Sequence, residues 1–263
     1  MFKITEISSL RSGIALLFLS GVFIGLTALQ SNTGKDFKAS QLKNTRVQEA
    51  YRDKEELVLN RLKDKIIDKK TVNIFLRVFK KEERLEVWAR STNQNVYLLL
   101  HNYEICASSG ELGPKRMSGD GQVPEGFYYI DRFNPYSNFY LSLGVSYPNK
   151  SDKILGTKGN LGGDIFIHGS CVTIGCMPLT DDKIKELYVL ALEARAAGQQ
   201  NIPVHIFPCE MDQDGMNYLE KTYKGNSTKI SFWNNIKKGF DIFNSTKKLP
   251  AVSIGTDGSY SFK

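Results

Sequence analysis

The chain has 263 residues, of which 41% are hydrophobic and 24% charged, with a formal net charge of +7. This composition excludes a disordered or collagen-like chain, and the length suits one sizeable domain with extensions, or two small domains. The basic balance indicates an anionic partner such as nucleic acid, a membrane surface or an acidic polymer, unless the lysines simply solvate the surface.

The amino-terminal segment predicts export. Lys3 and Arg11 precede an uncharged run at residues 13–29. A basic flank before such a run is typical of a signal peptide, or of a membrane anchor if the segment is not cleaved. A buried core helix is the alternative. Export would place the rest of the chain in the cell envelope, either periplasmic or anchored in the inner membrane facing the periplasm, and would exclude nucleic acid as the partner.

The next residues divide into a tether, a helix and a β-rich body. Residues 30–45 are polar and predict a tether, and residues 46–70 have apolar positions at helical spacing. From residue 71 to 209 the apolar runs are short and rich in β-branched and aromatic residues, as in strands. The predicted strands are residues 72–79, 85–90, 96–106, 127–133, 139–148, 164–169 and 202–207.

Two loops and two helices complete the pattern. Residues 107–126 contain five glycines and two prolines, and a loop of this length in a compact domain tends to be functional. Thr180 is a predicted N-cap for a helix that ends at Gly198. Residues 210–263 predict a helical C-terminal extension, with a helix at 231–243 and a short strand at 251–254. The fold class is therefore mostly β with a few helices (α+β).

The stretch from Asp164 to Thr180 carries the candidate chemistry. His168 ends an apolar run, and Cys171 and Cys176 follow within eight residues. A thiol with a nearby base and a flexible backbone turn can act as a cysteine nucleophile. Cys176 follows Gly175 and precedes the predicted helix, whose positive end would favour a thiolate.

Other interpretations of the cysteines and histidines stay open. Cys106 and Cys209 are expected to be small buried hydrophobic residues, and His101 and His205 to be structural. Cys171 could be a core residue, a resolving thiol or half of a disulfide with Cys176. A zinc site from His168, Cys171, Cys176 and His205 has a weak spacing signal, so no metal and no cofactor is predicted.

The segment IHGSCVTIGC resembles the catalytic segment of the L,D-transpeptidase (YkuD-type) domain family, in particular its YafK-like branch. His168-Gly169 would be the family's His-Gly pair, and residues 173–176 its cysteine block. The spacer is shorter than usual, Ile174 replaces a second histidine, and Pro178 stands where Arg or Asn is usual. The compressed form is shared by the branch. With the strand-loop-strand region upstream, the resemblance covers residues 72–209.

This resemblance implies a β-sandwich-like catalytic domain at residues 71–209 that acts on peptidoglycan stem peptides. Cys176 would attack a stem-peptide carbonyl, His168 would be the general base, and the N–H groups of Gly175 and Cys176 would hold the oxyanion. An amine acceptor would give cross-linking and water would give hydrolysis. The residues expected to bind or orient substrate are Arg116, Lys115, Arg132, Asn134, Ser170 and Thr173.

Three alternatives accompany that mechanism. Hydrolysis at the same site would make the protein a carboxypeptidase or an amidase that releases a wall-attached lipoprotein. A degenerate site would leave a cell-wall-binding module, and a zinc hydrolase is the third class. The predicted division is a signal or anchor at 1–29, a tether and helix at 30–70, the catalytic domain, and an extension at 210–263 packed on it.

Overall fold

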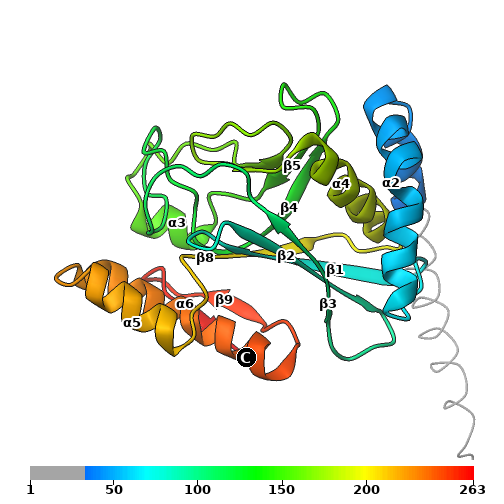
Figure 1. The fold of residues 1–263 in the computed structure, drawn as a ribbon. Coiled ribbons are helices and arrows are strands. Elements are labelled where there is room, and N and C mark those ends of the chain that lie inside the picture. The colour runs from blue at the N-terminus through cyan, green and yellow to red at the C-terminus, as the bar shows by residue number, and fades with distance from the viewer. Residues whose placement is uncertain (1–32) are drawn as a thin grey trace, which may run out of the picture.

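The computed structural model describes residues 33–263. Its main feature is a curled, mixed sheet of eight strands in the order β3-β2-β1-β8-β4-β5-β6-β7 (Figure 1). Neighbouring strands are antiparallel except the pairs β1/β8 and β6/β7, which are parallel. The strands are β1 Val72–Phe79, β2 Arg84–Ser91, β3 Leu98–Glu104, β4 Gly126–Asn134, β5 Ser142–Val145, β6 Phe166–His168, β7 Met177–Pro178 and β8 Ile202–Phe207.

Helices cover both faces of this sheet. Figure 1 shows α2 and α4 on one side and α5, α6 and β9 on the other. The expected α+β class is confirmed, but the predicted strands form one continuous sheet between helices rather than a sandwich of two sheets. The remaining elements are α2 Thr45–Asp64, α3 Lys150–Leu155, α4 Asp181–Ala196, α5 Gln213–Thr222, α6 Ser227–Thr246, and a second small sheet of β9 Val252–Ile254 and β10 Tyr260–Phe262.

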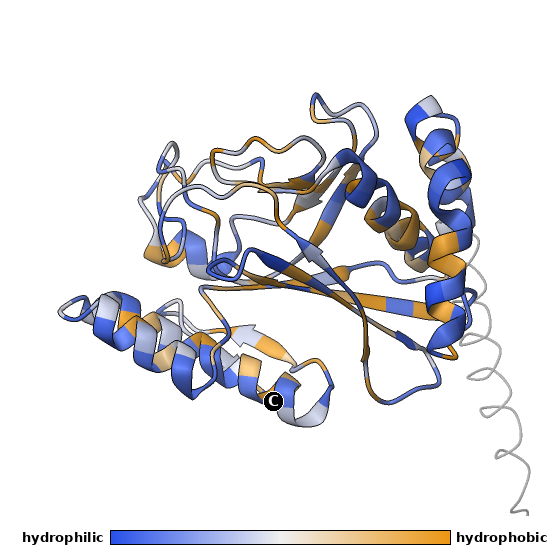
Figure 2. Ribbon diagram, in the orientation of Figure 1, coloured by the Kyte–Doolittle hydropathy of each residue, from blue (hydrophilic) through white to orange (hydrophobic). Residues whose placement is uncertain are grey.

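The central strands alternate between two cores. In β1, Ile74, Leu76 and Val78 face the core under α2 and α4, whereas Phe75 and Phe79 face the extension. Successive side chains of a strand point to opposite faces, so a strand covered on both sides is apolar throughout. Figure 2 shows this as an apolar centre among more polar outer helices.

An aromatic core joins the sheet to the C-terminal extension. Phe127 and Phe207 of the sheet share a buried cluster with Trp233 and Phe240 of α6. His205 of β8 packs edge-on against Phe75 and Phe127, with ring centroids 4.5 and 4.6 Å apart. Burial lowers the pKa of His205 to about 3. The structural role expected for this histidine agrees with its position.

A buried ion pair connects three parts of the chain. Glu125 is fully buried, and its carboxylate accepts hydrogen bonds from Lys80 Nζ at 3.0 Å, Gly113 N at 2.7 Å and Trp233 Nε1 at 2.7 Å. Lys80 is the first residue after β1, in the turn to β2. Gly113 lies in the long loop, and Trp233 belongs to α6. The pair therefore holds the sheet, the loop and the extension together.

Helix α4 begins and ends where the sequence predicts. Thr180 is the N-cap, with its hydroxyl accepting from Lys183 N, and the helix ends at Ala196, just before Gly198. Asp181 and Asp182 lie in the first turn, where their negative charges interact favourably with the positive end of the helix.

Three helical segments were not expected. Residues 33–41, predicted as part of a tether, are helical, because Phe37 packs on the core and Gln41 accepts a hydrogen bond from Tyr188 at 2.7 Å. Helix α3 replaces part of a predicted loop and is closed by a capping box at Asn149 and Asp152. Helix α5 is the third.

The predicted signal or anchor at residues 1–29 lies outside the described residues. Within residues 33–263, every helix is too short or too polar to cross a membrane.

Replacing Glu125 by Gln tests the buried pair. The change keeps the side-chain shape but removes the charge that compensates the buried Lys80 ammonium, so we expect the free energy of unfolding to fall by roughly 3 kcal/mol in urea denaturation. Glu220→Gln, at an exposed carboxylate of α5, is the matched control and should change it by less than about 0.5 kcal/mol. Equal stability of the two variants would contradict the role given to Glu125.

Candidate active site

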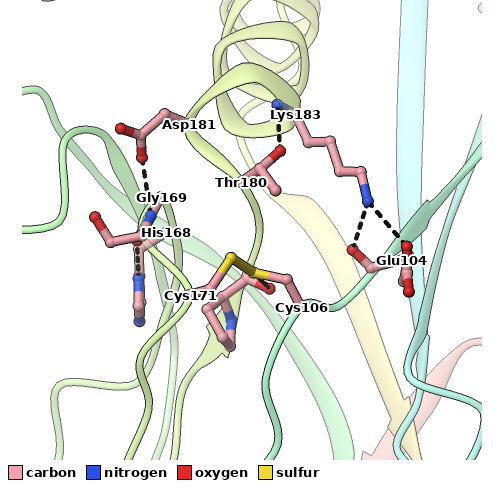
Figure 3. Close-up of a disulfide and its surroundings, with 10 residues drawn as sticks. Glu104, Cys106, His168, Gly169, Cys171, Thr180, Asp181 and Lys183 are labelled. Atoms are coloured by element: carbon pink, nitrogen blue, oxygen red, sulfur yellow. Dashed lines mark hydrogen bonds and ion pairs between the residues drawn. A yellow bond between two sulfur atoms is a disulfide. The ribbon is translucent and has the colours of Figure 1, made fainter.

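The structure corrects the predicted roles of two cysteines. Cys106 and Cys171 form a disulfide, with 65 residues of separation and a Cα–Cα distance of 5.4 Å. Cys106 is therefore not a buried hydrophobic thiol, and Cys171 does not pair with Cys176. Figure 3 shows the disulfide beside the segment that enters α4, next to the turn at His168 and Gly169. The bond attaches the loop after β6 to the segment after β3.

The disulfide leaves two free thiols in a chain of four cysteines. Cys209 is fully buried in the aromatic core, as predicted, and its pKa is raised to about 12 by burial. Cys176 is half-buried and borders a cavity of about 570 Å³. Of the two, only Cys176 is accessible to a substrate.

His168 ends β6, and Cys176 directly precedes the neighbouring strand β7. In the parallel pairing of β6 and β7, Ile167 is opposite Met177 and His168 is opposite Pro178. Cys176, directly before β7, is therefore level with Phe166. Alternate residues of a strand share a face, so continuing the alternation of β7 back by one residue puts Cys176 on the face of His168, offset by two residues.

The imidazole of His168 is fixed by two neighbours. It is almost fully buried, its ring stacks on Phe139 at 4.6 Å between centroids, and Nδ1 lies 2.5 Å from the carbonyl oxygen of Gly169. A carbonyl can only accept, so Nδ1 carries the proton. The other ring nitrogen, Nε2, is then left with the free lone pair that a general base needs.

Burial shifts both pKa values toward neutral side chains. Desolvation raises the pKa of Cys176, aided by the charge of Asp164 and opposed by the Phe166 amide and Lys115. Desolvation lowers the pKa of His168, opposed by its hydrogen bond to Gly169. The pair at neutral pH is thus a thiol and a neutral imidazole, not a thiolate and an imidazolium. The Cys176 thiol donates to the carbonyl of Asp164 at 3.6 Å.

The backbone before Cys176 is held by one hydroxyl. Thr173 Oγ1 accepts from Gly175 N at 3.2 Å and from Cys176 N at 2.8 Å, and donates to the Cys176 carbonyl. The sequence predicted that these two N–H groups hold an oxyanion, but in this structure both donate to Thr173. Gly175 has φ +132, and a Cβ there would lie 3.1 Å from the carbonyl oxygen of Gln122. Only glycine suits this position.

Besides Thr173, Arg132 is the predicted substrate residue that contacts the neighbours of Cys176. Its guanidinium is 45% exposed, pairs with Asp164 at 3.0 Å and covers the ring of Phe166. Asp164 is also the residue whose carbonyl accepts from the thiol. A partly exposed arginine at this position is suited to bind a carboxylate.

The other predicted residues have internal partners. Arg116 pairs with the buried Asp152 at 3.2 Å, Lys115 with Asp120, and Asn134 Oδ1 accepts from Tyr136 N in a turn. Ser170 has φ +64, and its N–H donates to Asp181 at the start of α4. The first turn of α4 thus contacts the turn after His168, not only the chain that follows Cys176.

Several residues of the site were not predicted. Phe139 and Gln122 come from loops whose sequence carries no sign of a contact with His168 or Gly175. The pairing of Cys171 with a distant cysteine had one signal in the sequence, since the predicted export and the four cysteines permit a disulfide between distant residues.

No cluster of three histidine, cysteine or acidic side chains that could hold a metal ion occurs within residues 33–263. The zinc set considered from the sequence is also incompatible with the disulfide, since Cys171 cannot supply a thiolate while it is bonded to Cys106.

A free, half-buried thiol directly before β7 and a buried histidine at the end of the neighbouring β6 are the residue types that cysteine-dependent enzymes use. Residues 73–206 match the L,D-transpeptidase catalytic domain (YkuD) family model. The chain belongs to this family, whose members modify peptidoglycan in the cell envelope by acting on its stem peptides.

A relative from Escherichia coli agrees with this membership. The chain is 36% identical over 189 residues to the protein named "Putative L,D-transpeptidase YafK" of Escherichia coli (strain K12), covering 71% of this chain and 72% of that protein. Two solved structures are also similar. The helical cell shape determining protein Pgp2 from Campylobacter jejuni has a TM-score of 0.42 at 18% identity, with 70% and 73% of the two chains covered. Bd1075 of Bdellovibrio bacteriovorus has a TM-score of 0.38 at 19% identity, with 72% and 79% covered.

Thiol mapping tests the cysteine assignment. Unfolding without reductant should expose two free thiols, Cys176 and Cys209, and digestion should give one peptide pair linking Cys106 to Cys171. Native iodoacetamide should label Cys176 before Cys209, because Cys209 is buried. A Cys171–Cys176 linkage would contradict the assignment.

Proposed function

We propose that the protein is a cysteine acyl transferase for peptidoglycan stem peptides, with Cys176 as nucleophile and His168 as general base. The observation that carries the proposal is that Cys176 is the one accessible free thiol of the chain and shares a sheet face with a buried histidine whose Nε2 is free. The family membership supplies the substrate class.

The first half of the reaction would form a thioester. His168 Nε2 takes the thiol proton as Cys176 Sγ attacks the stem-peptide carbonyl, and the C–N bond of the substrate then breaks. The imidazolium returns its proton to the departing amine. A neutral thiol and a neutral imidazole suit these steps, because the thiol still carries its proton and the imidazole is able to accept it.

The oxyanion would be stabilised by backbone N–H groups that are released from Thr173. We propose that the substrate carbonyl oxygen displaces the Thr173 hydroxyl from the N–H groups of Gly175 and Cys176. Hydrogen bonds to a developing negative charge are stronger than those to a neutral hydroxyl, so the exchange favours the transition state.

Substrate orientation is assigned mainly to Arg132. A stem-peptide carboxylate would compete with Asp164 for its exposed guanidinium, and this would place the carbonyl near the thiol. Arg116 and Asn134 would act by shaping the loops around the site, since their side chains are paired within the chain.

The second half of the reaction distinguishes transfer from hydrolysis. An amine that attacks the thioester forms a new C–N bond and gives a cross-link, whereas water gives a free acid. The predicted division into a catalytic domain at 71–209 and an extension at 210–263, and the location of the site in the periplasm, are parts of the same proposal.

Incubation with purified muropeptides, followed by liquid chromatography and mass spectrometry, tests the nucleophile. Cys176→Ser should lower the rate of product formation by a factor on the order of 10³ or more, because the thiolate is the attacking group. Cys209→Ser, at the other free thiol, is the control and should keep the rate if the variant folds. New dimers would indicate transfer, and shortened or released peptides would indicate hydrolysis. Full activity of Cys176→Ser would reject the proposal.

The pH dependence of kcat/KM tests the base. His168 must be neutral to accept the thiol proton, and its pKa is lowered from the ordinary value of 6.5. The rate should therefore fall only as the pH drops through a midpoint below 6.5. It should not fall near neutral pH on the alkaline side, because the Cys176 pKa is raised. A midpoint above 6.5 on the acid side would contradict this role of His168. A preformed thiolate–imidazolium pair would instead give a fall on the alkaline side, as the imidazolium loses its proton.

A further inference from the structure

The cavity beside Cys176 is formed partly by the C-terminal extension. We call it the Cys176–α5 groove, and its volume is about 570 Å³. Cys176 and Met177 line it together with the β1–β2 turn (Lys80, Lys81, Glu83), the first part of the long loop (residues 107–112), and Tyr218, Thr222 and Tyr223 of the α5 region. The nucleophile and the extension therefore border one continuous space.

The walls of the groove are tied to one another. Lys80 Nζ donates to the carbonyl oxygens of Glu111, Gly113 and Val123 at 2.9 to 3.0 Å and pairs with Glu125. From α6, Lys229 Nζ donates to the carbonyl oxygen of Leu112 at 2.8 Å. Fixed walls of this kind make a binding site that is formed before the ligand arrives.

Two lysines and two carboxylates line the groove. The Lys80 ammonium is buried and its donors are used by four oxygens. Lys81 covers the ring of Tyr218 at 4.9 Å and lies 3.6 Å from Glu82. Both lysines are therefore already compensated.

Two exposed carboxylates remain. Glu83 accepts from Ser108 Oγ, and Glu111 is 3.7 Å from Lys229. Each carboxylate has further acceptor positions for a ligand. These two exposed carboxylates can therefore attract a cationic group of a ligand, although the chain has a net charge of +7.

We propose that the Cys176–α5 groove binds the amine-side peptide of the reaction, through ammonium groups held by Glu83 and Glu111 and a peptide backbone packed along Tyr218. The amine-side peptide is the acceptor in transfer and the departing chain in hydrolysis. The inference rests on the proposed function, and it gives the extension the role of a wall of the substrate site. The acyl side would then bind on the side of Arg132.

Protection of Cys176 from iodoacetamide tests binding without requiring turnover. The probe is a purified disaccharide-tripeptide muropeptide whose free amine is on the side chain of its diamino acid, used as such and after N-acetylation. The free-amine form should slow alkylation of Cys176 in the full chain at lower concentration than the acetylated form. No protection by the free-amine form at millimolar concentration, or equal protection by both forms, would overturn the proposal.

Variants locate the binding. Glu83→Gln with Glu111→Gln should raise the half-protecting concentration about tenfold, equivalent to about 1.4 kcal/mol, and Glu220→Gln on α5 should leave it unchanged. Tyr218→Ala should raise it at least threefold, whereas Asn217→Ala, which does not line the groove, should not. Thermal unfolding of each variant shows that it is folded. A double glutamine variant that is protected like the unaltered protein would overturn the proposal.

These outcomes are separate from those for the nucleophile. If Cys176→Ser kept its activity, the proposed chemistry would fail whatever the protection data show. If Cys176→Ser were inactive but the glutamine variant were protected normally, only the assignment of the groove would fail.

Discussion

The buried pair of Lys80 and Glu125 is the interaction on which the arrangement of this protein depends. Both side chains are almost inaccessible to solvent, so each charge requires the other and the hydrogen bonds around them. Lys80 lies in the β1–β2 turn, and the hydrogen-bond partners of the pair come from the loop at residues 107–125 and from helix α6. The loop that covers Gly175 is thereby fixed to the extension, and the environment of Cys176 depends on residues far from it in sequence.

The site itself combines a rigid support with uncharged reactive groups. The Cys106–Cys171 disulfide closes a long chain loop, which by chain entropy alone contributes about 4 kcal/mol, and it anchors the turn between His168 and Cys176. Phe139 and Gly169 fix the imidazole. Burial keeps both partners neutral, so proton transfer would occur when substrate is present. The sequence predicted a thiolate stabilised by the positive end of helix α4. In the structure, Asp181 in the first turn of α4 accepts from Ser170 N.

Local patterns predicted much of the fold. β1, β8 and α4 carry strong periodic or capping signals, and His168 and Cys176 stand in a recognisable motif. Helix α5 was missed because Gly215 interrupts a polar sequence, and its lack of a side chain is required by the close approach of the Glu210 carbonyl. The helix at residues 33–41 depends on contacts with α4. The disulfide depends on a fold that brings together residues 65 positions apart, which spacing alone cannot show.

The central claim is that Cys176 carries the acyl group. Rapid acid quenching of the protein with muropeptides, followed by intact-protein and peptide mass spectrometry, measures this directly. The account predicts an adduct on Cys176 with the mass of the acyl part of the substrate, removed by hydroxylamine as a thioester would be. Turnover with no adduct on Cys176, continuing after that thiol has been alkylated, would contradict it.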